Sequence, residues 1–77
     1  MEILGLNRGK IKVIIEGKSL IITGELTTTP IFYADINSIK KWEYPHNEII
    51  INDEERENII KQIQEKTKDA VVKIIFD

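Results

Sequence analysis

Apolar and polar residues alternate along two neighbouring segments, residues 10–16 and 19–25. Alternation with a period of two predicts β-strands that each bury one face. The two residues between the segments, Gly17 and Lys18, suit a type II′ hairpin turn, because glycine stands first. Fixing that turn fixes the register of the hairpin. The predicted pairs are Ile15 with Leu20, Val13 with Ile22 and Ile11 with Gly24 on the apolar face, and Ile14 with Ile21 on the other.

Further strands are predicted on both sides of this hairpin from β-branched and aromatic residues bounded by turn formers. Residues 2–6 form a short edge strand, and residues 31–35 follow a loop that ends at Pro30. Residues 39–43 are expected to return as another short strand. Residues 70–76, rich in valine and isoleucine, close the sheet.

One helix is predicted to begin at Asn52 or Asp53, since either residue is a good N-cap. Acidic side chains crowd the first turn and lysines stand near the far end, which complements the helix dipole. The buried stripe at helical spacing consists of Ile59, Ile60, Ile63 and Thr67.

The predicted order of elements is therefore β-β-β-(β)-α-β. This order predicts an α+β fold, a small antiparallel β-sheet with one α-helix packed on one face. A chain of 77 residues has room for a single domain, residues 1–77, and the 42% of apolar residues suffices for one core.

Composition narrows the classes of function mainly by exclusion. The net charge is −2, and residues 25–60 carry eight acidic side chains against three basic ones. A nucleic-acid-binding protein would show a clustered basic face, so no nucleic-acid partner is expected. Neither a signal peptide nor a membrane span is predicted, and the chain has no cysteine. These features predict a cytoplasmic protein that does not bind membranes.

Candidate chemistry is sparse. His46 is the only histidine, and neither Asp35 nor Glu48 completes a catalytic arrangement with it in the sequence. The acidic run 53–57 lacks the spacing of a calcium loop and is explained by the helix dipole. We therefore predict no catalytic residues, no metal site and no cofactor.

Aromatic residues suggest where the chain binds a partner. The segment 40–46 contains the only tryptophan, Trp42, together with Tyr44 and His46. Tryptophan and tyrosine are enriched at binding hot spots. Trp42 could equally cap the core while its neighbours form the surface, and the two roles are not exclusive. The predicted partner-binding residues are Trp42, Tyr44, His46, Glu43 and Asp35.

The same segment resembles the central motif of the immunity protein 74 family. The resemblance rests on Phe32-Tyr33-Ala34-Asp35, on Asn37-Ser38-Ile39-Lys40-Lys41-Trp42-Glu43 and on Pro45-His46. Its most specific part is Ser38-Ile39-Lys40, Trp42-Glu43 and Pro45-His46, and it extends from about residue 8 to residue 76. It implies a small α+β protein of a bacterial polymorphic toxin system that binds and neutralises a cognate toxin domain.

Three hypotheses of function follow. In the first, the chain is a non-catalytic immunity protein that covers the active surface of a toxin. In the second, it is a small structural domain that forms a homodimer through the sheet face containing Ile14 and Ile21. The third hypothesis, an enzyme, has the least support because the required groups are not assembled.

Overall fold

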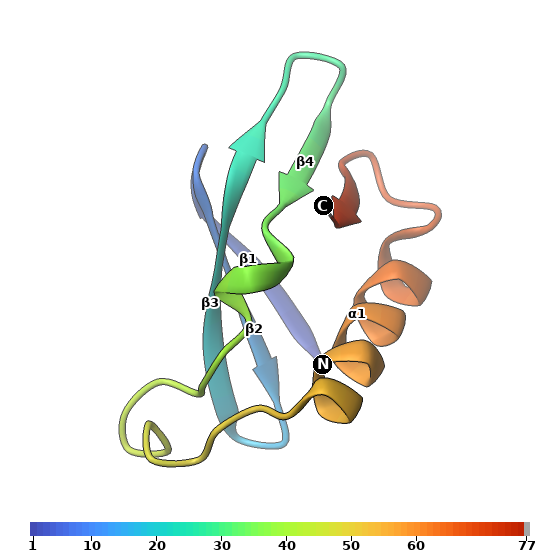
Figure 1. The fold of residues 1–77 in the computed structure, drawn as a ribbon. Helices are drawn as coiled ribbons and strands as arrows, with labels where there is room; N and C mark the ends of the chain where they lie inside the picture. Colours follow the sequence, from blue (N-terminus) through green and yellow to red (C-terminus); the bar gives the residue numbers. More distant parts are fainter. Residues whose placement is uncertain (77) are drawn as a thin grey trace.

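The computed structural model describes residues 1–76, and it contains five strands, one 3₁₀-helix and one α-helix. Figure 1 shows the helix lying across one side of the sheet. The α+β class predicted from the sequence is confirmed. The elements are β1 (Glu2–Asn7), β2 (Lys10–Ile15), β3 (Lys18–Leu26), β4 (Ile31–Ala34), η1 (Ile36–Ser38), α1 (Asp53–Thr67) and β5 (Lys73–Phe76).

The five strands form one sheet in the order β1-β2-β3-β4-β5. The first four pair antiparallel, whereas β5 runs parallel to β4, with Phe32 opposite Ile74. The sheet is therefore mixed, and the expectation of a purely antiparallel sheet was wrong in its last strand. The cause is α1, which carries the chain back along the sheet as a crossover, so that the next strand starts from the same end as β4.

The hairpin between β2 and β3 turns one position earlier than predicted. Ile15 is opposite Lys18, so the two loop residues are Glu16 and Gly17, with φ angles of 50° and 80°. Two successive positive φ angles are typical of a type I′ turn, whose twist matches that of the flanking strands. The register moves by two positions, to Val13 opposite Leu20 and Ile11 opposite Ile22. An even shift keeps every side chain on its predicted face.

Residues 39–43 do not form the short strand that was predicted. Only one isolated bridge, between Lys41 and Ile50, joins this segment to another. Ile39 and Trp42 are instead buried, at 0% and 4% exposure, and their packing replaces a ladder of hydrogen bonds. The closing strand is also shorter than predicted, because residues 70–72 form a loop before β5.

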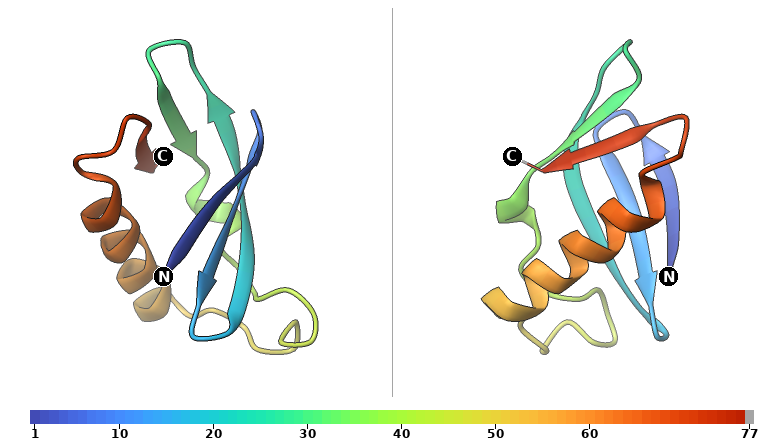
Figure 2. Two further views of the ribbon diagram at one scale, coloured as in Figure 1. Left: turned by 180° about the vertical axis from the view of Figure 1, so that it is seen from behind. Right: turned by 90° about the vertical axis from the view of Figure 1, so that its right-hand side faces the viewer.

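The core lies between one face of the sheet and α1 (Figure 2). Asn52 is the N-cap of the helix, and its side chain accepts a hydrogen bond of 2.8 Å from the Glu55 amide. Ile63 is fully buried, which is worth about 1.5–3 kcal/mol relative to an exposed position. The buried side chains are Ile11, Val13, Leu20, Ile22, Phe32, Ala34, Ile39, Trp42, Ile51, Ile59, Ile63 and Ile74.

Gly24 is the position in the sheet where a side chain has no room. A Cβ atom there would lie 2.2 Å from the Tyr33 carbonyl oxygen and 2.7 Å from the Phe32 ring. We expect Gly24→Ala to destabilise the protein by about 1–3 kcal/mol, because strand β4 would have to move away. Gly5 is the matched control, since a Cβ atom there meets nothing within 4 Å. Urea denaturation of both alanine variants tests this, and equal stabilities would contradict it.

The turn at Glu16 offers a gain in stability. Asparagine adopts the left-handed conformation more readily than glutamate, and Asn-Gly is the favoured type I′ pair. We expect Glu16→Asn to raise the free energy of unfolding by about 0.5–1 kcal/mol. Glu16→Val serves as the opposite control, because a β-branched residue resists a positive φ. The type I′ assignment would be refuted if thermal denaturation ranked the valine variant above the asparagine variant.

Candidate functional site

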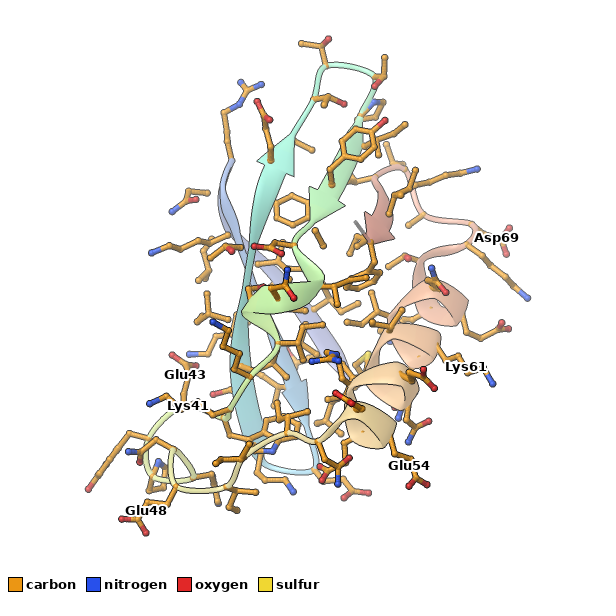
Figure 3. The ribbon with its side chains drawn as sticks, viewed as in Figure 1. Lys41, Glu43, Glu48, Glu54, Lys61 and Asp69 are labelled. Carbon is orange, nitrogen blue, oxygen red and sulfur yellow. The ribbon has the colours of Figure 1, made fainter. Side chains whose placement is uncertain are left out.

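The predicted partner-binding residues all lie in the connection between β4 and α1. This connection starts with Asp35 and η1, and continues as an irregular loop, residues 40–51. The base of the loop is closed by the bridge between Lys41 and Ile50 and by a 2.8 Å hydrogen bond from the Ile51 amide to the Lys40 carbonyl. The loop projects beyond the hairpin end of the sheet (Figures 1 and 3).

Asp35 is exposed, and its carboxylate shapes the start of the connection. The side chain accepts a 2.9 Å hydrogen bond from the Asn37 amide, and its carbonyl accepts a 2.6 Å bond from the Ser38 hydroxyl. The Ser38 oxygen in turn accepts a 3.1 Å bond from the Thr23 amide on β3. These local bonds explain why an aspartate and a serine stand at this turn.

Trp42 lies in the core beneath the loop and is only 4% exposed. The Lys18 ammonium stands 5.0 Å from the centre of its ring, a cation–π contact worth about 0.5–1 kcal/mol near a surface. The indole Nε1 is buried without a hydrogen-bond partner among the described residues. Of the two roles that the sequence left open, the structure shows the core role, so a partner would meet the surface that Trp42 supports.

Glu43 ties the loop to the outer face of the sheet, the face turned away from α1. Its amide donates a 2.8 Å bond to the Ser19 carbonyl, and its carboxylate accepts a 2.8 Å bond from the Ser19 hydroxyl. The Lys12 ammonium lies 3.3 Å from the same oxygen. The Ser19 hydrogen bond, helped by Lys12 and partly opposed by desolvation, holds the pKa of Glu43 below its ordinary value of 4.5.

Three large apolar side chains are exposed in the loop. Tyr44 is 86% exposed, Ile50 75% and Ile49 44%, and we call these three residues the loop patch. A cis peptide bond joins Tyr44 to Pro45. His46 is half-buried, and its backbone holds the loop through bonds of 2.8 Å to the Glu43 carbonyl and 3.0 Å from the Ile49 amide.

Carboxylates accompany the loop patch. Glu48 projects from the loop next to Ile49, and Glu43 lies on the side facing the sheet (Figure 3). Further acids stand at the start of α1, which follows the loop directly; they are Asp53, Glu54 and Glu55. The arrangement presents an apolar contact area whose charged border is mostly acidic but includes Lys40 and Lys41, and such an area is suited to binding a protein.

The model of one protein family, Immunity protein 74, matches residues 3–77 of the chain. The chain belongs to the Immunity protein 74 family. The resemblance stated from the motif around Trp42 is therefore confirmed over nearly the whole chain. Searches of the curated proteins and of the solved structures gave no significant match.

The structure of this Immunity protein 74 family member adds two residues to the candidate surface. Ile49 and Ile50 were not among the predicted partner-binding residues, yet both are exposed, whereas the next residue, Ile51, is 4% exposed. Three isoleucines in succession carry no periodic signal, so the sequence could not tell the exposed ones from the buried one. The bridge between Lys41 and Ile50, which closes the loop, separates the two exposed isoleucines from the buried Ile51.

Within residues 1–76, no group of three or more histidine, cysteine or carboxylate side chains is placed to hold a metal ion. Within the same residues, no helix is long and apolar enough to cross a membrane.

The anchor at Glu43 predicts a pH-dependent stability. Because its pKa is lowered in the folded state, its stabilising effect is complete above the ordinary pKa of 4.5 and is lost as the pH falls through the folded-state pKa. We expect Glu43→Gln to be less stable than the wild type at pH 7 and to converge with it in acid. Urea denaturation between pH 7 and pH 2.5 measures this. A difference in stability that persists at the acid end would show that the carboxylate charge is not its source.

Proposed function

We propose that this protein is a non-catalytic immunity protein that binds a cognate toxin and neutralises it by covering the toxin's active surface. The observation that carries the proposal is the match of the Immunity protein 74 model to residues 3–77. The binding mode suggested by the surface agrees with this function, since the exposed groups form a contact area and not a reaction centre.

The loop patch is the proposed centre of the interface. A tyrosine that is 86% exposed is a suitable anchor, because it can bury a large aromatic surface on binding at a small cost in side-chain entropy. Ile50 and Ile49 extend the apolar area beside it. Trp42 acts from beneath, where its buried ring supports the backbone that carries Tyr44.

Charge is proposed to select the partner. Asp35 contributes an exposed carboxylate and Glu43 contributes one that is paired with Lys12, and we propose that His46 lies at the rim of the contact area. An acidic surface attracts basic partners and raises their rate of association. Toxins that act on nucleic acid have basic active sites, so such a toxin is the proposed target.

Occlusion requires that the binding surface be held ready. The loop is fixed at its base by the bridge between Lys41 and Ile50, on the sheet by Glu43, and in the core by Ile39 and Trp42. A surface that is already ordered loses less conformational entropy on binding, and this increases affinity. We propose that the protein acts in the bacterial cytoplasm, where a toxin made by the same cell would first be harmful.

The alternative proposal is a homodimer without a toxin. The sheet face containing Ile14 and Ile21 would form its interface, but in the observed register these residues face Ser19 and Lys12, not each other. The Glu43 carboxylate also lies on Lys12 and Ser19, which adds polar groups to that face. Sedimentation velocity over a range of concentrations tests this alternative, and a monomer throughout would exclude it.

Co-expression with each protein encoded next to this chain, followed by co-purification and a toxicity assay, tests the immunity function. We expect one neighbour to be toxic alone, to bind the chain with one-to-one stoichiometry and to be harmless in its presence. If no neighbour binds, or if binding leaves toxicity unchanged, the proposal fails.

The interface is tested by Tyr44→Ala and Ile50→Ala, which we expect to weaken toxin binding at least about tenfold each, since central apolar anchors typically contribute more than 1.4 kcal/mol. Val71→Ala is the matched control, because Val71 is 88% exposed but lies in the loop before β5. Isothermal titration calorimetry gives the affinities. Unchanged affinity in both loop variants would remove the loop patch from the interface. Trp42→Ala is unsuitable for this purpose, because it would remove a buried core side chain.

A further inference from the structure

Strand β1 is the end strand of the sheet, and one of its edges has no neighbour. In the antiparallel ladder, peptide groups point alternately to one side and the other. The two-residue hairpin makes Ile15 and Lys18 a hydrogen-bonded pair, so residues 10, 12 and 14 of β2 bond toward β1. Leu4 is therefore bonded to β2, and Ile3 and Gly5 present their amide and carbonyl groups to the open edge. No turn, loop or cap hydrogen bond within the described residues uses either backbone.

A cavity of about 420 Å³ opens beside this edge, on the core side of the sheet. It separates β1 from the end of α1 and from the loop before β5, so that the sheet and the helix do not close on each other there. Its walls are mainly apolar and come from every layer of the fold. The residues that define it are Ile3 and Gly5 of β1, Phe32 of β4, Thr67 of α1, Val72 of the loop and Ile74 of β5.

Gly5 opens directly into this cavity. It shares the core-facing row of the sheet with Ile11 and Ile22, both buried, and it lines the cavity itself. A Cβ atom built on Gly5 meets nothing within 4 Å, and Gly5 has no positive φ angle that would require glycine. At Gly5 the backbone of β1 therefore carries no side chain. A strand added beside β1 could place one of its own side chains at this position.

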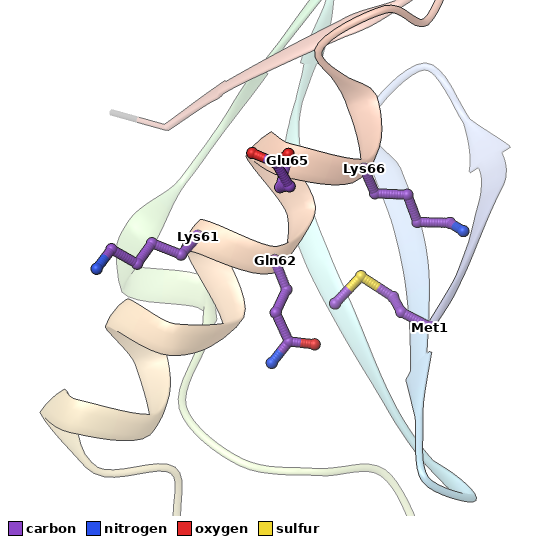
Figure 4. A pocket seen from close by; sticks show the side chains of 5 residues that line it. All are labelled: Met1, Lys61, Gln62, Glu65 and Lys66. Atoms are coloured by element: carbon purple, nitrogen blue, oxygen red, sulfur yellow. The ribbon is translucent and has the colours of Figure 1, made fainter.

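Positive charge borders the cavity. Lys66 lines both this cavity and an adjoining shallow hollow, where its side chain extends alongside Met1 at the start of β1 (Figure 4). Lys61 lines the same hollow. The other charged residue there, Glu65, is paired with Lys68 at 2.9 Å, whereas neither Lys61 nor Lys66 has an ion pair within the described residues. The border can therefore accept a carboxylate.

We propose that the open edge of β1 binds an extended segment of the toxin as a sixth strand of the sheet; this inference rests on the proposed function. The segment pairs with the peptide groups of Ile3 and Gly5, places an apolar side chain in the cavity, and directs an acidic side chain to Lys66. Strand addition supplies affinity through main-chain hydrogen bonds, and the pocket for alternate side chains supplies specificity. The site lies at the free edge of β1, whereas the loop patch lies in the connection between β4 and α1, so the site would be a second contact with the toxin.

A second copy of this chain would fit the same edge less well. Its own β1 would present Ile3 and Gly5 on the core-facing side, so that Ile3 could fill part of the cavity in the register that places it opposite Gly5. The only acidic residue of β1, Glu2, lies in the row with Ile14 and Ser19 on the outer face, away from Lys66. Pairing of two β1 strands would thus satisfy the backbone and part of the cavity, but it would bring no carboxylate to Lys66.

Graded filling of the cavity tests the proposal. The probe is the neighbour-encoded toxin domain that co-purifies with the wild type, made inactive by substitution in its own active site. We expect Gly5→Ala, Gly5→Val and Gly5→Leu to weaken its binding progressively, with a loss of at least about tenfold for leucine. Their melting temperatures should equal or exceed that of the wild type, because a side chain at position 5 occupies free space. Leu4→Ala, on the other face of the same strand, should bind as the wild type does.

Two further measurements bear on backbone pairing and charge. On binding of the toxin domain, amide hydrogen exchange at Ile3 and Gly5 should slow by at least about tenfold if these groups enter a ladder. Lys66→Glu should weaken binding and Lys73→Glu, on the outer face of β5, should not.

Full binding by Gly5→Leu, or unchanged exchange at Ile3 and Gly5, overturns the strand proposal and leaves the immunity function standing. A wild-type dimer that Gly5→Leu dissociates also overturns it, and a wild type that binds no toxin overturns both.

Discussion

The burial of Ile39 and Trp42 is the contact on which the arrangement of this protein depends. The connection from β4 to α1 spans residues 35–52 and contains only the short η1 and one isolated bridge. Without a hydrogen-bonded ladder to hold it, the connection is fixed to the core by these two side chains, which are 0% and 4% exposed, while Glu43 ties it to Ser19 on the sheet. They bring the chain beneath the hairpin end of the sheet, where Asn52 can start the helix on the correct side. Packing thus replaces regular structure in this segment.

The sequence predicts which side chains share a face of the sheet. This assignment depends only on whether a residue stands at an odd or an even position along its strand. Ile11, Val13, Leu20 and Ile22 were assigned to the buried face although the turn was placed one residue too late. The choice between two neighbouring turns depends on backbone twist, which Glu16-Gly17 satisfies and which composition does not reveal. The parallel direction of β5 likewise depends on how the crossover packs, a property of the assembled layers and not of residues 73–76.

The candidate surface stays a prediction, and the structure shows only which of its side chains are accessible. Within residues 40–46, the segment chosen for its hot-spot composition, Tyr44 is exposed and Trp42 is turned inward. The exposure of Ile49 and Ile50 arises from the bridge at the base of the loop, so no local sequence pattern predicts it. The opening beside β1 is still less visible in sequence, because its walls come from β1, β4, α1, β5 and the loop before β5. Family membership is therefore what supports the proposed binding role, and the surface geometry shows which side chains a partner could contact.

The parallel pairing of β4 with β5 also has a consequence for the order of folding. The strands β1 to β4 are joined by short connections, so their contacts close small loops and form with little loss of chain entropy. The pairing of Ile31 with Lys73 must instead wait until the long connection and α1 have been placed. The cavity beside β1 is built from both groups, since Ile3 and Ile74 line it together. It therefore forms only when the most non-local strand pairing of the sheet is made, and a chain that has not yet added β5 would expose the sheet without offering that opening.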